Sequence, residues 1–332
     1  MTARLDPDTL PLIDADHAAG HPVGAAVSGG SDSTALLLLL ADRYGAGSVR
    51  AVTIDHRLRP EAAEEAAAVA RLCAACGIAH ETLVWEGWDG RGNLQDAARR
   101  ARYALLSDWA QPRGIRTVAL GHTLDDNAET FLMGLTRGAG LDGLSGMRPV
   151  FSRAGIRFAR PLLGAHRADL RQYLTARGVG WIEDPSNEDP RFDRVRARSV
   201  LAQLAPLGVD ADRLGLTIAN LRRTRAAIEA HLGTWSDTHI RVDRGDLLIG
   251  ADAFRAIPED FARRLMNAAL RWVSAADYPP RAEKVMQLLD RREGGATLHG
   301  CLVTFGDTIR VAREPRAAAQ APAAAPGALW DG

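Results

Sequence analysis

The chain has 332 residues, of which 46% are hydrophobic and 25% are charged, and its formal net charge is zero. These proportions are typical of a soluble globular protein, and the length is sufficient for two domains. A zero net charge excludes a chain that is basic throughout and binds nucleic acid without selection, so any nucleic-acid contact must come from a local basic patch. Arginine supplies almost all of the positive charge, because Lys284 is the only lysine.

Short apolar segments alternate with longer alanine- and arginine-rich segments through the first half of the chain. The apolar segments, which predict strands, are residues 23–28, 49–55, 79–85 and 116–122. The longer segments, which predict helices, lie near residues 33–44, 60–76, 93–112 and 124–137. This alternation predicts an α/β fold with a doubly wound, mostly parallel, Rossmann-like sheet. Ligands bind at the carboxyl ends of the strands of such a sheet, so we expect the chemistry just after residues 28, 55 and 121.

The pattern changes after residue 140, where a glycine-rich segment interrupts it. Residues 160–178 predict a further helix, residues 208–235 predict a long one, and from about residue 236 short strand-like runs surround a helix-like run. The predicted parts are a main α/β domain over 1–205, a helical linker over 206–235, a small α+β domain over 236–312 and a disordered Ala/Pro-rich tail over 313–332.

The N-terminus and the cysteines indicate the compartment. Residues 1–20 have neither the cationic start nor the apolar core of a signal peptide, and the longest apolar run, residues 35–41, is much shorter than the roughly 20 residues that span a bilayer. We therefore predict a cytoplasmic protein with no membrane segment. Three cysteines do not indicate a disulfide framework. Cys73 and Cys76 form a C-x-x-C pair, which is either half of a metal or redox site or, as we favour, two small residues at the end of a helix.

The loop after the first predicted strand reads Ser28-Gly29-Gly30-Ser31-Asp32-Ser33. It is not a Walker A loop, which needs a lysine, and it lacks the G-x-G-x-x-G of a dinucleotide fingerprint. Its adjacent glycines allow the backbone to approach an anion closely, and the following helix presents free N–H groups. Asp32 makes sense beside phosphates if it holds a divalent cation. The alternative is a plain tight turn, but a lone Gly-Gly pair would suffice for that.

A second polar segment follows the fourth predicted strand. Asp126 and Glu129 are three residues apart and share one face of a helix that begins near Leu124. Two carboxylates at the mouth of the sheet can bind Mg²⁺ or an ammonium group. The alternative is an acidic helix start that interacts only with the helix dipole.

These two segments resemble a known family. The sequence SGGSDS is similar to the signature of the PP-loop ATP pyrophosphatases, and GHTLDDNAETF (121–131), with the R-G-x-G that follows it, resembles the tRNA(Ile)-lysidine synthetases. Further similar segments, in the order of that family, are residues 53–66, 93–106, 160–174 and 184–201. Two positions depart from the family pattern, since Asn127 replaces the usual Gln and Val195 stands where an Asn between arginines is expected.

The resemblance implies a reaction, partners and a division into domains. Members of this family use ATP to adenylylate C2 of the cytidine at the first anticodon position of an isoleucine tRNA with a CAU anticodon. They then attach free L-lysine through its side-chain amine and release AMP and pyrophosphate. The resemblance implies ATP and Mg²⁺ at the site, a PP-loop catalytic domain over 1–205 and tRNA binding by 236–312. A homodimer is one expectation for the assembly.

The resemblance also implies a role for each matching residue. The ATP site would comprise Ser28, Gly29, Gly30, Ser31, Asp32, Ser33, Asp55, His56, Gly121 and His122. The metal ligands would be Asp32, Asp126 and Glu129, of which the last two could instead bind the incoming lysine. The catalytic set would be Asp32, Arg102, Asp126, Glu129 and Arg194. The tRNA-binding arginines would be Arg194, Arg196 and Arg198.

Two other classes of protein are alternatives. A tRNA thiolase of the same fold would depend on cysteines, for which Cys73 and Cys76 are the sole candidates. A non-catalytic nucleotide-binding module would have no need for so many carboxylates around a phosphate site. The arginines of 191–198 and 222–225 could also be surface residues, and we favour a substrate or tRNA contact only for 191–198.

Overall fold

The computed structural model describes residues 5–57, 61–88, 93–184, 189–276 and 280–314. It divides into two compact units, Met1–Arg223 and Thr224–Gly332. The division falls within the segment 206–235 that the sequence suggests as a linker. The predicted tail 313–332 lies almost entirely outside the described residues.

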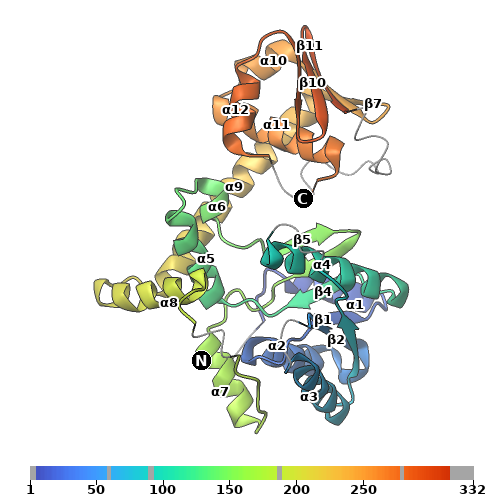
Figure 1. Ribbon diagram of the computed structural model, residues 1–332, viewed down its shortest axis with the longest axis vertical. Coiled ribbons are helices and arrows are strands. Elements are labelled where there is room, and N and C mark those ends of the chain that lie inside the picture. Colours follow the sequence, from blue (N-terminus) through green and yellow to red (C-terminus); the bar gives the residue numbers. More distant parts are fainter. Residues whose placement is uncertain (1–4, 58–60, 89–92, 185–188, 277–279, 315–332) are drawn as a thin grey trace. The chain divides into compact units, whose positions relative to one another are not determined.

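The first unit is built on a six-stranded sheet with the order β3-β2-β1-β4-β6-β5 (Figure 1). Its strands are β1 (Val23–Ala26), β2 (Val49–Asp55), β3 (Ala79–Val84), β4 (Thr117–Leu120), β5 (Val150–Arg153) and β6 (Ile156–Ala159). Neighbouring strands are parallel except β5 and β6, which pair antiparallel. The strand order reverses between β1 and β4, and a crevice for ligands forms at such a point in an open α/β sheet.

Helices cover both faces of this sheet. The helices on the two faces are α1 (Leu10–Ala18), α2 (Ser31–Tyr44), α3 (Ala62–Ala75), α4 (Leu94–Ala110) and α7 (Arg167–Ala176). Helices α5 (Leu124–Leu135), α6 (Leu141–Leu144) and α8 (Asp193–Leu204) form a separate apolar cluster, and short 3₁₀ turns lie at Ala46–Ser48, Gln111–Arg113 and Ala205–Leu207. On one face Val23 and Ala25 pack in a core with α2, α3 and α7, whereas Ala26 packs on the other face with α4. Side chains of a strand alternate between the two faces, which is why one strand serves both cores. The predicted doubly wound, mostly parallel fold is confirmed.

One predicted helix begins later than expected. The sequence predicts a helix over 160–178, but α7 starts at Arg167. Pro161 and Gly164 disfavour a helix in the preceding segment, and Leu162 instead forms an isolated bridge with Thr123. This extended segment carries Arg160 along the end of β4, which matters for the site described below.

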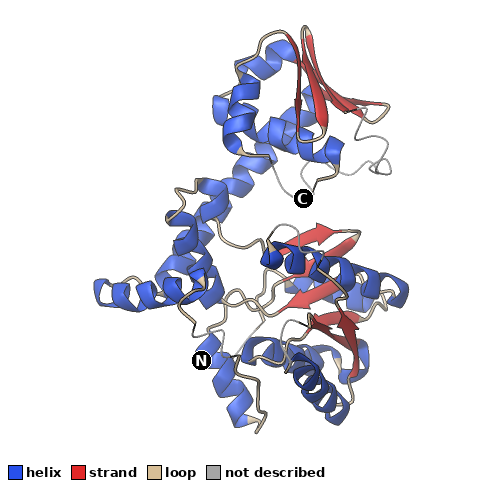
Figure 2. Ribbon diagram, viewed as in Figure 1, coloured by secondary structure: helices blue, strands red, loops and turns tan. Residues whose placement is uncertain are grey.

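The second unit combines an antiparallel sheet with helices (Figure 2). Its strands, in the order β7-β8-β11-β10-β9, are β7 (Ile240–Asp243), β8 (Asp246–Gly250), β9 (Gly294–Leu298), β10 (Cys301–Phe305) and β11 (Thr308–Arg313). Its helices are α10 (Ala251–Ala256), α11 (Glu259–Ser274), α12 (Ala282–Leu289) and the end of α9 (Ala211–His239), which begins in the first unit. Leu265, Ala269 and Val273 of α11 are buried against the sheet. The predicted small α+β region is thus confirmed, with more helices than the sequence indicates, and the single lysine, Lys284, lies exposed on α12.

No helix in the described ranges is both long enough and apolar enough to cross a membrane.

Candidate active site

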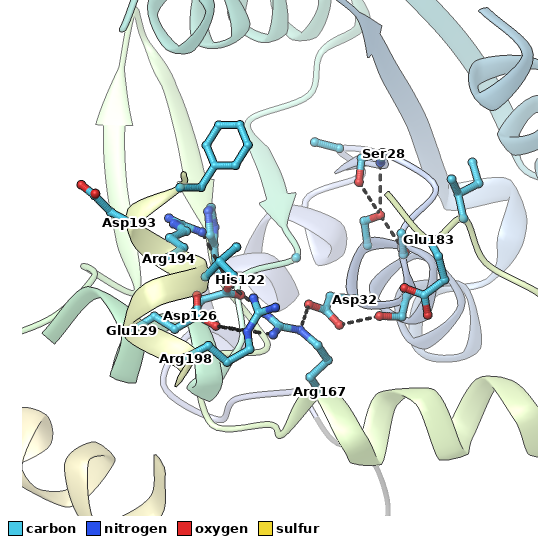
Figure 3. Close-up of a pocket in the computed structure, with 18 of the residues that line it drawn as sticks. Ser28, Asp32, His122, Asp126, Glu129, Arg167, Glu183, Asp193, Arg194 and Arg198 are labelled. Carbon is cyan, nitrogen blue, oxygen red and sulfur yellow. Dashed lines mark hydrogen bonds and ion pairs between the residues drawn. The ribbon is translucent and has the colours of Figure 1, made fainter. Parts of the chain in front are cut away.

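A cavity of about 630 Å³ opens in the first unit at the carboxyl ends of β1 and β4. The loop before α2, the start of α5, the start of α7 and the start of α8 all contribute side chains to it (Figure 3). The sheet order reverses at these two strands, so the cavity lies where the topology predicts a ligand.

The glycine-serine loop has the backbone shape that the sequence suggests. Gly29 has φ of +89°, and its carbonyl accepts a hydrogen bond from the Ile182 N–H at 2.9 Å. A Cβ atom at Gly29 would lie 2.4 Å from Ile182 Cδ1, so both the backbone angle and the close approach favour glycine here. Helix α2 begins at Ser31, and its first N–H groups therefore face the cavity without helical partners.

Hydroxyl groups fix the rest of this loop. The Ser33 Oγ accepts a hydrogen bond from the Ser28 N–H at 3.1 Å and donates to the Gly30 carbonyl at 3.1 Å. The Ser31 hydroxyl donates to Asp32 Oδ1 at 2.9 Å. Of the six predicted loop residues, five line the cavity, and Gly29 lies behind them. These hydroxyls hold the loop in shape, and the N–H groups at the start of α2 can bind an anion such as a phosphate.

Three carboxylates converge on one arginine (Figure 3). Arg167, the first residue of α7, places its Nε 2.9 Å from Asp32 Oδ2 and an Nη atom 3.0 Å from Asp126 Oδ1. A second Nη atom lies 3.6 Å from Glu129 Oε1. The three predicted metal ligands are therefore brought together, but a guanidinium lies among them. A buried cluster of carboxylates without such a cation would be strongly destabilising.

The three carboxylates differ in their readiness to take up a proton. Burial raises the pKa of Asp32, and the nearby Arg167 does not fully offset this. Burial and the adjacent Asp126 likewise raise the pKa of Glu129. Asp126 is buried too, but Arg167 and a hydrogen bond from the Thr123 N–H hold the pKa of this carboxyl below its usual value. Asp126 thus carries the most stable negative charge of the three.

The two carboxylate oxygens of Glu129 differ in their hydrogen bonding. Its side chain is 1% exposed, and Oε1 pairs with Arg198 at 3.0 Å. Its other oxygen, Oε2, is buried and has no hydrogen-bond partner within the part of the chain that the structure describes. Unsatisfied buried acceptors are rare in proteins, and this one is free to bind a cation or a proton donor that enters the cavity.

The arginines from α4 and α8 form a positive wall of the cavity. Arg194 lies 3.5 Å from Asp126, whereas Arg102 makes no ion pair or hydrogen bond with any residue that the structure describes. Burial, together with the charges of Arg99 and Arg194, lowers the pKa of Arg102. Since a guanidinium stays charged in proteins, Arg102 is a half-buried cation without an ion-pair partner among the described residues, and an anion in the cavity would stabilise it.

Not every predicted residue lies in the cavity. Gly121 and His122 line it, but Asp55 and His56 do not. The Asp55 carboxylate accepts the Arg57 N–H at 2.8 Å, and the His56 ring packs edge-on against Trp85 beside a separate hollow at the ends of β2 and β3. Arg196 also points elsewhere, because its guanidinium bonds Asp193 and the carbonyls of residues 190 and 191.

Two residues that the sequence did not single out are part of the site. Arg167 joins the carboxylates, and Arg160 donates from Nε to His122 Nδ1 at 3.2 Å. Both lie in the segment 160–174, which the family resemblance includes without a role for either residue. The sequence shows that Arg160 directly follows a strand, β6, but it does not show that His122 is its hydrogen-bond partner.

The structure explains one of the two residues that differ from the family pattern, Asn127, but not the other, Val195. Asn127 is 3% exposed, and its Oδ1 accepts the Met147 N–H at 2.8 Å. It therefore ties α5 to the glycine-rich loop after α6, and Gly146 (φ +67°) leaves room for it, since a Cβ there would lie 2.4 Å from Asn127 Oδ1. Val195 is half-buried at the rim of the cavity, and nothing in the structure explains why it replaces an amide.

Comparison with known proteins decides among the alternatives. Residues 12–205 match the family described as PP-loop domain. A tRNA(Ile)-lysidine synthase of Ruegeria pomeroyi is 48% identical over 315 residues, which cover 93% of this chain and 75% of that protein. The chain belongs to the tRNA(Ile)-lysidine synthase family. The resemblance found in the sequence motifs is thereby confirmed.

Other relatives named tRNA(Ile)-lysidine synthase extend this match. The protein of Hyphomonas neptunium is 41% identical over 85% of this chain and 78% of its own length. That of Methylobacterium nodulans is 40% identical over 87% of this chain and 89% of its own length. The similarity thus reaches well beyond the PP-loop domain.

A solved structure has a similar fold over part of this chain. The U34-tRNA thiolase NcsA from Methanococcus maripaludis, solved with its 4Fe–4S cluster, superposes with a TM-score of 0.52 at 17% identity, over 61% of this chain and 72% of that one. At this identity the likeness concerns the fold alone. In the present chain Cys73 is buried with its pKa raised by burial to about 11, and Cys76 follows it at the end of α3. Among the described residues no group of three or more His, Cys, Asp or Glu side chains is arranged to hold a metal ion.

Proposed function

We propose that this protein joins the side-chain amine of L-lysine to C2 of the cytidine at the first anticodon position of an isoleucine tRNA with a CAU anticodon. Membership of the tRNA(Ile)-lysidine synthase family makes the protein an ATP-dependent ligase that modifies tRNA. The observation that carries the proposal is one cavity that contains a glycine-serine loop, a cluster of carboxylates and an arginine, Arg102, which has no ion-pair partner among the described residues. The reaction needs all three, because it expels pyrophosphate, transfers AMP and consumes an amine.

The loop and the arginines serve the nucleotide in this proposal. The N–H groups at the start of α2 bind the phosphates that leave as pyrophosphate. Arg102 stabilises the negative charge that develops when the cytidine oxygen attacks the α-phosphoryl group. The oxygen on C2 of cytidine is a poor leaving group by itself. Once it is adenylylated, it departs as part of AMP when the amine attacks C2. The adenosine would lie toward Asp55 and His56, at the ends of β2 and β3.

The carboxylates serve the amine. Lysine must attack in its neutral form, so a proton has to leave its ammonium group. Asp126 attracts the ammonium group, because its charge is the most stable of the three. Glu129 accepts the proton, since its Oε2 is unoccupied and burial raises its pKa. Arg167 balances the negative charge of the three carboxylates and keeps them close together.

A magnesium ion fits the site only together with the nucleotide. The carboxylates alone do not form a three-ligand site, so the phosphates of ATP must complete the coordination. Asp32 is the residue that would hold the ion, since its carboxylate lies in the loop that binds the phosphates and lines the cavity. The ion would supply charge neutralisation and polarise the phosphoryl oxygens.

The tRNA is held by arginines in this proposal. Arg194 and Arg198 stand at the rim of the cavity, and Arg196 lies next to them on the exposed side of α8. The anticodon bases are unstacked easily, which allows the cytidine to enter the cavity.

Residues 236–312 form a second contact with the tRNA. Removal of 236–332 should leave ATP binding intact and raise the tRNA concentration needed for reaction. Equal tRNA affinity before and after this deletion would contradict the second contact.

The decisive experiment incubates the protein with ATP, Mg²⁺, labelled lysine and a mixture of tRNAs. We expect label in one isoleucine acceptor only, together with AMP and pyrophosphate. Release of ADP and phosphate would contradict the PP-loop chemistry, and label in no tRNA would contradict the choice of substrate. Light scattering of the same sample gives the number of chains in the particle, which tests the expected homodimer.

A further inference from the structure

The hydrogen bond between Arg160 and His122 determines where the imidazole carries its proton. Arg160 Nε lies 3.2 Å from His122 Nδ1 and donates to it. A guanidinium has five N–H donors and no acceptor, so the nitrogen it contacts must be the one without a hydrogen. In a neutral imidazole the hydrogen is then on Nε2.

Arg160 itself is held on three sides. Its side chain is 5% exposed, and its Nη1 donates to the carbonyl of Arg148. Its guanidinium lies over the Phe151 ring, 4.5 Å from the centroid, and its backbone N–H bonds the Pro149 carbonyl at 2.8 Å. A cation over an aromatic face gains further electrostatic stabilisation. A turn of the Arg160 side chain away from His122 would therefore break its contacts with the Arg148 carbonyl and the Phe151 ring.

His122 lines the cavity beside the phosphate loop. It follows Gly121, which packs on the backbone of Ser33 in the first turn of α2. Burial, and after it the charge of Arg160, lower the pKa of His122 to about 3, with Arg102 and Arg194 acting in the same direction and Asp126 opposing them. The ring is therefore neutral at physiological pH, and its Nε2–H is a donor that does not depend on pH.

We propose that Arg160 is a positioning residue that locks His122 in the Nε2–H tautomer, so that His122 acts as a fixed hydrogen-bond donor to an oxygen of the α-phosphoryl group. This inference rests on the proposed function for the identity of the acceptor. His122 is then neither a general base, since Nε2 already holds its hydrogen, nor a cation. A neutral donor in a buried site stabilises developing negative charge without a proton transfer. Arg102 supplies the full charge at the same place.

The tautomer can be measured without the reaction. Long-range ¹H–¹⁵N correlation spectra of the ¹⁵N-histidine-labelled protein distinguish a protonated ring nitrogen from an unprotonated one. The chain has nine histidines, and the His122 signals are those missing from His122→Gln. We expect a protonated Nε2 and a bare Nδ1, unchanged from pH 8 to pH 5. A hydrogen on Nδ1, or an imidazolium in this range, would overturn the proposal.

Variants separate positioning from a merely structural role. Arg160→Met should convert the His122 signals into a mixture of tautomers, and retention of the pure Nε2–H form would show that Arg160 does not lock the ring. If this variant does not fold, the wild-type spectrum still decides the question.

A matched pair at position 122 tests the donor. The amide of His122→Gln reaches the position of Nε2, whereas that of His122→Asn reaches only the position of Nδ1. Removal of one such donor costs about 10²–10³-fold in kcat. We therefore expect His122→Asn to lose about this factor in AMP formation and His122→Gln to keep at least ~10-fold more activity than Asn, both with an unchanged KM for lysine. Equal activity of the two variants would refute the donor role. If wild-type protein forms no AMP with any tRNA, the proposed function fails, while the tautomer measurement still stands.

Discussion

Gly121 fixes the distance between β4 and the phosphate loop, and a single methyl group should disturb it. An ideal Cβ at this position would lie 2.9 Å from Ser33 Cα and 3.0 Å from the Ser33 N atom. Carbon atoms in contact are separated by about 3.5–4.0 Å, so Gly121→Ala must push the first turn of α2 away by roughly 0.6–1 Å. Both contacts are backbone atoms, which cannot rotate aside as a flexible side chain can.

This displacement predicts two separate losses. Overpacking of this size costs about 1–3 kcal/mol of folding stability. A shift of about 1 Å in a group that positions a substrate costs roughly 10²-fold in rate, which is about 2.7 kcal/mol of transition-state stabilisation. We therefore expect Gly121→Ala to melt several degrees lower and to form AMP about 100-fold more slowly under saturating ATP and tRNA.

The assay measures tRNA-dependent release of pyrophosphate at a temperature at which the variant is fully folded. Gly47→Ala is the matched control, because a Cβ there meets no atom within 4 Å and the backbone angle is not a left-handed one. The control should keep wild-type activity and melting temperature. Wild-type kcat in Gly121→Ala would refute the claim that this contact sets the position of the loop.

Three further outcomes are expected. Arg102→Met should lower kcat for AMP formation by about 10²–10³-fold, because it removes a positive charge from the wall of the cavity, and circular dichroism should show an intact fold. Asp32→Asn should abolish pyrophosphate release at every Mg²⁺ concentration, since an amide lacks the charge that Mg²⁺ requires; near-normal turnover would exclude Asp32 as a ligand. Burial and the charge of Asp126 raise the pKa of Glu129 in the folded protein above its value of about 4.3 in the unfolded chain. The free energy of unfolding of the parent protein therefore increases as the pH falls from the folded-state pKa toward the unfolded-state pKa. Glu129→Gln should therefore melt above the parent at pH 7, and the difference should shrink toward pH 5 in thermal scans.

The parts of the molecule that rest on local sequence could be predicted. The strand ends and the loop 28–33 follow from apolar runs and glycine chemistry within a few residues, and both lie where the sequence suggests. Asp126 and Glu129 share a helix face because three residues separate them, which needs no knowledge of the rest of the fold.

The remainder depends on contacts between distant residues. Asp32 and Arg167 form an ion pair although 135 residues separate them, and no local pattern indicates this pairing. The sequence therefore suggests that Asp32, Asp126 and Glu129 are free to bind a metal. In the folded chain all three lie next to the Arg167 guanidinium. Asp55 follows a strand as predicted, but its carboxylate caps the turn at Arg57 instead of entering the cavity. A position at the end of a strand therefore predicts that a residue lies at the carboxyl edge of the sheet. Whether its side chain enters the cavity depends on the turn that follows the strand.

The cations that line the cavity are all arginines among the residues described, namely Arg102, Arg167, Arg171, Arg191, Arg194 and Arg198. Lysine acetylation, a common way to silence a basic site, has no target in the first unit, since Lys284 is the only lysine and belongs to the second. A guanidinium also keeps its charge at any pH that a cell experiences. The positive charge of the cavity is therefore insensitive both to lysine acetylation and to pH in the range that a cell experiences.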